Sequence, residues 1–310
     1  MEFFRVNNDI PFMRHALKFN IFSVVLLLLA IFFLATRGLN LSVEFTGGTL
    51  VEVSYPVAVQ VEPIRQALSR EGYTDAQVQH FGSARDVLVR LPTREGMDSH
   101  RISENVLQTL QAMDGPDPEL RRVEYVGPQI GDELVADGAL ALLFVLIGIM
   151  IYLALRFEWR FSLAAIVAIL HDMIVILGFF SLFQWDFSLA VLAAVLAALG
   201  YSVNETVIIF DRIRETFKKK RGLKTPEVIN HAITRVISRT IITHSTTLMV
   251  VFTMLIFGGE TLHYFSLALA ISIIFGMYSS MLVSSPVVMW LGVSREQFIK
   301  PKKEKEEAVV

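Results

Sequence analysis

A carboxylate lies inside an apolar run of this 310-residue chain. The stretch GYSVNETVIIFDRIRE (200–215) continues a hydrophobic segment that begins near Phe187, yet it contains Glu205 with Asn204 beside it. A charged group at membrane depth is costly, so such a residue usually faces a helix bundle and marks a path for ions or substrate. Binding and release of a proton is the chemistry that this carboxylate offers. The alternative is that the segment ends early and Glu205 belongs, with Asp211, to the solvated exit of a helix.

Three further ionisable residues lie in or beside apolar runs. His171 and Asp172 are adjacent in one run, and Arg239 immediately precedes TIITHSTTL (240–248). Helical spacing predicts one shared face for Arg239, Thr243 and Thr247, and another for Tyr201, Glu205 and Arg212. The alternatives are that His171 and Asp172 only form hydrogen bonds to adjacent helices, and that Arg239 is a snorkelling anchor at the membrane surface.

The composition indicates that these residues belong to a membrane protein. Hydrophobic residues make up 53% of the chain and charged residues 19%, against about 25% charged in an ordinary soluble domain. A membrane-spanning helix needs about 20 mostly apolar residues. Six stretches meet or approach that length: 19–36, 134–155, 161–183, 187–210, 240–257 and 264–285. The first has a longer apolar core than a cleaved signal peptide and no clean cleavage site after it, so it is predicted to be a retained span.

Small residues precede Glu205 in the fourth of these spans. They are Ala190, Ala193, Ala194, Ala197 and Ala198. Because small residues let helices approach closely, this run favours a position inside the bundle for the span that carries Glu205.

Lysine and arginine gather in alternate connections between the spans. They are Arg5, Arg14 and Lys18 before the first span; Arg156 and Arg160 between the second and third; Arg212, Arg214, Lys218, Lys219, Lys220, Arg221, Lys224 and Arg235 between the fourth and fifth; and Arg295, Lys300, Lys302, Lys303 and Lys305 after the sixth. The links at 184–186 and 258–263 contain neither residue type. By the positive-inside rule, both termini are predicted to be cytoplasmic. Glu205 then lies toward the cytoplasmic end of its span.

Residues 37–133, between the first two spans, are predicted to form a folded domain on the other side of the membrane. Alternating apolar residues predict strands in 49–56, on both sides of Gly82-Ser83 within 76–92, and in 120–127. Helical spacing predicts helices in 61–73 and 99–113. The order β-α-β-β-α-β is typical of a ferredoxin-like α+β domain.

Nothing in this domain pairs a nucleophile with an evident base, which favours a binding or mechanical role over an enzyme. The stretch Thr46-Gly47-Gly48-Thr49 lacks the lysine and helix that follow in a phosphate loop, so it is predicted to be the turn into the first strand. The absence of cysteine from the chain excludes disulfides and thiolate metal sites.

The chain is therefore predicted to be an α-helical membrane protein of four parts. These are a cytoplasmic N-terminus with the first span (1–36), the external ferredoxin-like domain (37–133), a region of five membrane helices (134–291) and a basic cytoplasmic tail (292–310).

The motifs and their order resemble the SecD/SecF family of the bacterial Sec translocase, in the RND superfamily, and follow its SecF pattern. The resemblance rests on VEFTGGTLVEV, VGPQIGDEL, LHDMIV, YSVNETVIIFDRIRE and SRTIITHSTTL, and it covers nearly the whole chain. The family usually has aspartate where this chain has Glu44, before Gly47 and Gly48, and where it has Glu205. Both departures keep a carboxylate and add one methylene.

The resemblance implies roles for particular residues. Glu205 would take part in proton movement with Arg239 as its partner. Supporting polar residues in the membrane would be Asn204, His171, Asp172, Thr243, Thr247 and Asp211.

The resemblance also implies partners. The chain would pair with SecD, its homologue, to make a full RND-like unit in the bacterial inner membrane. This unit would associate with the SecYEG channel and use the proton gradient to draw preproteins across. The preprotein and membrane lipids are further expected partners. Neither nucleic acid nor ATP nor a redox cofactor is expected to bind.

Two other functions stay open on the sequence. A self-sufficient proton-coupled transporter of a small molecule or lipid would use the same carboxylate, but six spans are half of an RND architecture, so it would have to homodimerise. A passive assembly factor would tolerate neutralisation of Glu205. Co-purification with a SecD-like partner or with a second copy separates the first function from the transporter.

Overall fold

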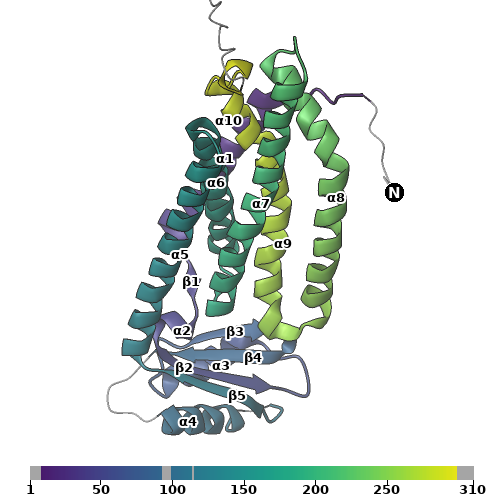
Figure 1. The fold of residues 1–310 in the computed structure, drawn as a ribbon. Helices are drawn as coiled ribbons and strands as arrows, with labels where there is room; N and C mark the ends of the chain where they lie inside the picture. Colours follow the sequence, from purple (N-terminus) through teal and green to yellow (C-terminus); the bar gives the residue numbers. More distant parts are fainter. Residues whose placement is uncertain (1–7, 93–98, 114, 299–310) are drawn as a thin grey trace, which may run out of the picture.

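The computed structural model describes residues 8–92, 99–113 and 115–298, and it has two parts (Figure 1). Long helices run side by side in a bundle, and a small sheet with two helices lies across one end of it. The two ends of the described chain lie at the opposite end of the bundle from the sheet. The basic tail is described only as far as the short 3-10 helix η2 (Arg295–Phe298), so the predicted Arg5, Lys300, Lys302, Lys303 and Lys305 lie outside the described residues.

The bundle consists of helices that are apolar along most of their length. They are α1 (Ala16–Arg37), which follows the 3-10 helix η1 (Phe12–His15), then α5 (Pro128–Arg156), α6 (Trp159–Phe183), α7 (Leu189–Lys219), α8 (Thr225–Phe257), α9 (Gly259–Leu282) and the short α10 (Ser284–Trp290). In the described part of the chain, six helical segments are long and apolar enough to cross a membrane, the last being α9 with α10. The predicted number of spans is confirmed.

Two of these helices are longer than predicted. α7 continues to Lys219 instead of ending near residue 210, and α8 begins at Thr225 instead of residue 240. The basic residues assigned to a long link therefore lie mostly on helices, and residues 220–224 alone connect the two.

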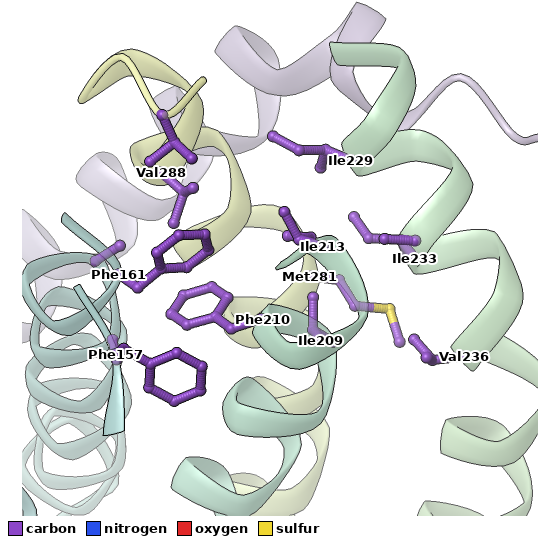
Figure 2. Close-up of a cluster of buried hydrophobic side chains, with 14 of the residues drawn as sticks. Phe157, Phe161, Ile209, Phe210, Ile213, Ile229, Ile233, Val236, Met281 and Val288 are labelled. Atoms are coloured by element: carbon purple, nitrogen blue, oxygen red, sulfur yellow. The ribbon is translucent and has the colours of Figure 1, made fainter. Parts of the chain in front are cut away.

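A hydrophobic cluster explains these extensions (Figure 2). Ile209, Phe210 and Ile213 of α7 are fully buried, and they pack in one cluster with aromatic side chains from the α5–α6 corner and apolar ones from α8. The other labelled members are Phe157, Phe161, Ile229, Ile233, Val236, Met281 and Val288. Since an amphipathic helix is stabilised by burying one face, α7 and α8 continue as helices although their other faces are charged.

The external domain is a sheet of four antiparallel strands in the order β3-β4-β2-β5. The strands are β2 (Gly48–Ser54), β3 (Gln77–Phe81), β4 (Ser83–Leu91) and β5 (Glu119–Val126), and the helices are α3 (Val61–Arg70) and α4 (Ser99–Gln111). Each predicted strand and helix of the domain is present, and the order along the chain and in the sheet is that of a ferredoxin-like domain.

The alternation of side chains gives the sheet two apolar faces. Val51, Val53, Val87 and Val89 are fully buried against α3 and α4, which contribute the buried residues Ile64, Leu68, Ile102, Val106 and Leu110. Leu50 and Leu88 point to the opposite face, which lies toward the bundle, and they pack with Val43.

Short elements that were not predicted join the two parts. β1 (Asn40–Leu41) pairs in parallel with β6 (Asp186–Phe187), which lies between α6 and α7. The one-turn helix α2 (Val43–Thr46) follows β1 and ends at Gly47, whose φ is 68°. Gly48, with φ at 130°, then starts β2. The turn predicted at residues 46–49 is therefore confirmed, and α2 immediately before it is a new finding.

Candidate functional site

Polar side chains connect α7 to α8 along one seam. The Tyr201 hydroxyl donates a hydrogen bond to Thr247 Oγ1 at 3.3 Å. One turn further along α7, the Thr240 hydroxyl donates to Glu205 Oε1 at 2.5 Å. Arg212, farther along α7, borders a hollow with residues of α8. The predicted shared face of Tyr201, Glu205 and Arg212 is confirmed, since all three lie toward α8.

Glu205 is buried near the middle of α7, with 4% of its surface exposed. Its carboxylate accepts one hydrogen bond, the bond from Thr240, within the described residues. An ionised carboxylate has acceptor capacity for about four hydrogen bonds. The bundle therefore buries Glu205 and, among the described residues, supplies one donor to its carboxylate, so the interpretation of Glu205 as a solvated exit residue is wrong for this structure.

Arg239 lies one residue before Thr240, but it does not contact Glu205 in this conformation. Its side chain is exposed and forms no hydrogen bond or ion pair with another described residue. One residue corresponds to about 100° around a helix, so Thr240 faces α7 while Arg239 points to the side. Joint action of Glu205 and Arg239 stays a prediction.

The hollow beside Arg239 has a volume of about 480 Å³. It is lined by Ile208, Asp211, Arg212 and Glu215 of α7 and by Arg235, Val236 and Arg239 of α8. Ile208 lies three residues after Glu205, and Val236 lies four residues before Thr240. The hollow therefore begins one helical turn from the Thr240–Glu205 bond, on the side away from the external domain.

The acidic residues of the hollow already have cationic partners. Asp211 pairs with Arg156 of α5 and Arg214 of α7. Glu215 pairs with Arg212 and Lys219. Asp211, predicted as a supporting residue, thus joins α7 to α5 and makes no bond to Glu205.

The other predicted supporting residues on these two helices do not reach Glu205. Thr243 and Thr247 donate to backbone carbonyls of their own helix, at Arg239 and Thr243 respectively. Thr243 is exposed like Arg239, whereas Thr247 is half-buried and bonds to Tyr201, so the predicted common face holds for Arg239 and Thr243 and not for Thr247. Asn204 is exposed on α7.

Two residues of the seam were missed by the sequence analysis. Thr240 is buried and is the hydrogen-bond donor to Glu205. His244 is also buried, its Nδ1 lies 2.8 Å from the Thr240 carbonyl, and its ring meets Tyr201 edge-on at 5.1 Å. A nitrogen that bonds to a carbonyl must carry the proton. The spacing of residues 240, 244 and 247 was the signal that would have placed them on the face toward α7.

A second buried carboxylate, Asp172, binds three helices together. Its Oδ2 accepts hydrogen bonds from Ser202 of α7 at 2.6 Å and from Ser279 of α9 at 2.8 Å. Its Oδ1 lies 3.0 Å from His171 Nδ1 on its own helix, α6. With 1% of its surface exposed, Asp172 has the geometry of a brace between helices.

The family motif before the external domain lies at the junction of sheet and bundle. Glu44 Oε2 accepts a hydrogen bond from the backbone N–H of Leu189, the first residue of α7, at 2.6 Å. Gly47 and Gly48 form the turn from α2 into β2. Within the described residues, no group of three or more histidine, aspartate or glutamate side chains is placed to hold a metal ion.

Two family models match the sequence. The model for "Protein export membrane protein SecD/SecF, C-terminal" matches residues 105–294, and the model for the "SecD/SecF GG Motif" matches residues 32–55. The second match contains Glu44, Gly47 and Gly48.

Relatives named as protein translocase subunits are similar over nearly their full length. Protein translocase subunit SecF of Vibrio alginolyticus is 41% identical over 307 residues, which are 99% of this chain and 98% of the relative. SecF of Pseudomonas aeruginosa is 42% identical over 281 residues, or 90% of each chain. SecF of Escherichia coli O157:H7 is 37% identical over 287 residues, or 92% of this chain and 89% of the relative.

Solved structures share the fold. The crystal structure of SecDF, a translocon-associated membrane protein from Thermus thermophilus, aligns with a TM-score of 0.85 at 34% identity. A SecDF structure in a "Super-membrane-facing form" aligns with a TM-score of 0.69 at 35% identity. Each alignment covers 93% of this chain and 39% of the SecDF chain.

Proposed function

The chain belongs to the SecD/SecF family of protein-export membrane proteins, and we propose that it couples the proton gradient to preprotein movement through the SecYEG channel, together with SecD. The relatives that it matches are named protein translocase subunit SecF, and six helical segments in the described part of this chain are long and apolar enough to cross a membrane. The use of the proton gradient, the contact with SecYEG and the handling of the preprotein belong to the proposal.

The observation that carries the proposal is the state of Glu205. It is a buried carboxylate with one hydrogen-bond donor among the described residues, one turn away from a charged hollow. A carboxylate with unused acceptor capacity can exchange a proton or a partner without breaking a larger network. Asp172, which is bonded on both of its oxygens, lacks that freedom.

The hollow supports a route for protons to one side of the membrane. Its charged lining can hold water, and Ile208 and Val236 lie in the turn between it and Glu205. By the positive-inside rule, the basic ends of α7 and α8 lie in the cytoplasm. In the proposed cycle, Glu205 releases its proton into this hollow after receiving it from the opposite side.

Arg239 is the residue expected to respond to the charge of Glu205. It borders the same hollow, carries no ion pair with the described residues, and lies next to the donor Thr240. Each proton delivers roughly 2.3 kcal/mol per 100 mV of membrane potential. That energy biases two conformations only if they differ in proton affinity, and an approach of Arg239 to ionised Glu205 in one of them supplies such a difference.

A second conformation is consistent with the structures of relatives. The two SecDF chains have nearly the same identity to this chain, yet their TM-scores differ, at 0.85 and 0.69. The alignment covers 39% of the SecDF chain, so the remainder of that chain has no counterpart among the aligned residues. In the proposed assembly SecD supplies it, and it covers apolar side chains that α1, α5 and α8 expose, such as Leu28, Leu155 and Phe257.

The test is Glu205→Gln in sealed vesicles that contain SecD and the channel. We expect the gradient-stimulated part of preprotein translocation to fall to the level of vesicles without this chain, while ATP-driven translocation persists. Glu205→Asp restores the side chain that is usual in the family and is expected to keep stimulation. Glu62→Gln is the control, because Glu62 is a glutamate of α3 that pairs with Arg65 and lies outside the hollow.

Arg239 is tested in the same vesicles. Arg239→Leu is expected to reproduce the Glu205→Gln defect. Full stimulation in Glu205→Gln at normal expression would end the proton proposal, and a homodimer purified without SecD would favour the self-sufficient transporter instead.

A further inference from the structure

The segment Ser42–Gly48, which we call the wedge, contacts both the external sheet and the membrane bundle. Three consecutive side chains of α2 point to three different places. Val43 packs with Leu50 and Leu88 of the sheet. Phe45 packs in the bundle cluster with Phe187, at 6.0 Å between ring centroids. Glu44, between them, bonds to α7.

Glu44 holds the first turn of the helix that carries Glu205. Its Oε2 accepts from Leu189 N at 2.6 Å and from the Ser42 hydroxyl at 3.1 Å. The first N–H groups of a helix have no partner within the helix, and a carboxylate there is also favoured by the helix dipole. Glu205 lies 16 residues along the same helix, about 24 Å away at 1.5 Å per residue.

A second contact ties the sheet to the beginning of α7. Arg90 of β4 is buried and forms an ion pair with Asp186 of β6, two residues before the N-cap of α7. Arg90 also lies 3.4 Å from Asn40 Oδ1. Asn40 and Asp186 are paired residues of the β1–β6 ladder, so the ion pair and the ladder reinforce one another.

The start of α5 packs closely against the backbone of the wedge. A Cβ atom on Gly131 would lie 2.8 Å from the Phe45 carbonyl oxygen and 3.0 Å from Gly47 N. A Cβ on Gly48 would lie 2.4 Å from the Leu91 carbonyl oxygen, at a φ of +130°. Only glycine allows these approaches, so backbone packs against backbone and leaves the wedge little room to move independently.

We propose that the wedge transmits movement of α7 to the external domain, with Glu44 as the positioning residue. The wedge joins the N-terminus of α7, the link before it and the start of β2, so a displacement of α7 carries the sheet with it. This inference rests on the proposed function and deepens it, because it gives proton binding at Glu205 a mechanical route to the external domain. It also gives a role to each part of the family motif: Glu44 holds the start of α7, and the glycine pair forms the turn into β2.

The attachment is tested by distance measurement between spin labels. The chain has no cysteine, so Ser69→Cys on α3 and Lys218→Cys at the end of α7, both exposed positions, give two defined labels. In the complex with SecD in nanodiscs, we expect one narrow distance distribution for the labelled parent chain. Glu44→Gln is expected to broaden it or to add a second population, and Glu44→Asp to have an intermediate effect because its carboxylate is one methylene shorter.

Glu52→Gln is the matched control, because Glu52 lines the same small hollow as Glu44 and has no hydrogen bond to the bundle among the described residues. An unchanged distribution in both Glu44 variants, or the same broadening in Glu52→Gln, would overturn the proposal. Glu44→Asp keeps the test informative if Glu44→Gln does not assemble.

A second measurement separates the wedge from the proton site. A second label pair joins Ser69→Cys to Thr253→Cys, an exposed position on α8, and its distance is recorded with and without acidification. This pair reports movement of the domain against α8, whereas attachment to α7 keeps the Ser69–Lys218 distance constant; gradient-stimulated translocation is measured in vesicles. Glu205→Gln is expected to keep the narrow distribution and lose its response to acid. Glu44→Gln is expected to lose the narrow distribution and with it the stimulation, although a label pair within the bundle still responds. If Glu205→Gln responds to acid like the parent chain, the proton proposal fails. The wedge proposal is then still tested separately, by the width of the Ser69–Lys218 distance distribution in the Glu44 variants.

Discussion

Asp172 and Glu205 are both carboxylates buried in the helix bundle, yet the surrounding helices give them different numbers of hydrogen-bond partners. Asp172 has 1% of its surface exposed and contacts His171, Ser202 and Ser279, which lie on three helices. Glu205 has 4% of its surface exposed and, in the part of the chain that the structure describes, one donor, Thr240. The similar burial of the two carboxylates means that burial alone does not distinguish a brace from a site of exchange.

The number of donors makes the distinction. Breaking the Asp172 contacts would leave the Ser202 hydroxyl and His171 Nδ1 without their partner in a dry interior, while the Ser279 hydroxyl keeps the Gly276 carbonyl as an acceptor. Each unpaired group carries its own desolvation cost. Breaking the Glu205 contact would leave one hydroxyl, that of Thr240, without its acceptor at the edge of the α7–α8 seam. A bundle that must change conformation can therefore pivot at the α7–α8 seam while α6, α7 and α9 stay joined through Asp172.

The largest expected effect on stability is at Asp172. Asp172→Ala removes the acceptor shared by the two serine hydroxyls and His171, and we expect a loss of about 2–4 kcal/mol in the free energy of unfolding. Unfolding of the purified protein in mixed micelles measures it. Asp172→Asn keeps one acceptor oxygen and is the control, with a smaller loss. A loss as small as that of Glu205→Gln would break the comparison between the two carboxylates.

The next effect concerns Thr240, the hydrogen-bond donor to Glu205. Thr240→Val keeps the shape of the side chain and removes the hydroxyl, and we expect a loss of about 1–2 kcal/mol together with reduced gradient-stimulated translocation. Thr240→Ser keeps a hydroxyl and should restore both. Unfolding in micelles and translocation in vesicles are the two measurements. Normal translocation in Thr240→Val would mean that the position of Glu205 does not depend on this bond.

A smaller effect is expected for one donor of Asp172. Ser202→Ala removes one of the three contacts, and the average hydrogen bond between membrane helices is worth about 0.6 kcal/mol. A double-mutant cycle with Asp172→Asn isolates the pair. A Ser202–Asp172 coupling energy below measurement error would indicate that Ser279 and His171 are sufficient to hold Asp172 in place. Ser202→Ala is expected to leave translocation unchanged.

Much of the fold could be predicted because its signals are local. Apolar runs predicted six spans, and alternation and helical spacing predicted each element of the external domain. The faces shared by Glu205 and Arg212, and by Arg239 and Thr243, also followed from spacing. The full lengths of α7 and α8 could not be predicted in this way. Their amphipathic turns combine buried residues such as Phe210 and Ile213 with charged neighbours, and a search for apolar runs stops at the charges.

The difference between the two carboxylates could not be predicted, because it depends on distant residues. The donors to Asp172 lie 30 and 107 residues away along the chain, and the donor to Glu205 lies 35 residues away. The wedge was missed for the same reason, since Glu44 and Leu189 are 145 residues apart. A single sequence gives the residue types at these positions but not the packing of helices that brings them together.

The smallest effect is expected at Asp86, which repeats the serine contacts of Asp172 on the water-exposed domain. Hydrogen bonds from Ser54 and Ser83 hold the pKa of Asp86 below its ordinary value, and the Ser83 bond is 2.5 Å long. Because the folded-state pKa is the lower one, the stability that Asp86 contributes is present above the ordinary aspartate pKa and is lost as the pH falls through the folded-state pKa. Ser83→Ala is expected to raise the pKa of Asp86 and to change the free energy of unfolding at neutral pH by less than about 0.5 kcal/mol.

An NMR titration of labelled aspartate in the full-length chain measures this shift, with Ser69→Ala on exposed α3 as the control. Serine hydroxyls that stabilise a carboxylate in water will stabilise one more strongly in the bundle, where no water competes for its oxygens. An unchanged pKa in Ser83→Ala would remove that support, and the number of serine donors would then no longer explain why Asp172 is held by more contacts than Glu205.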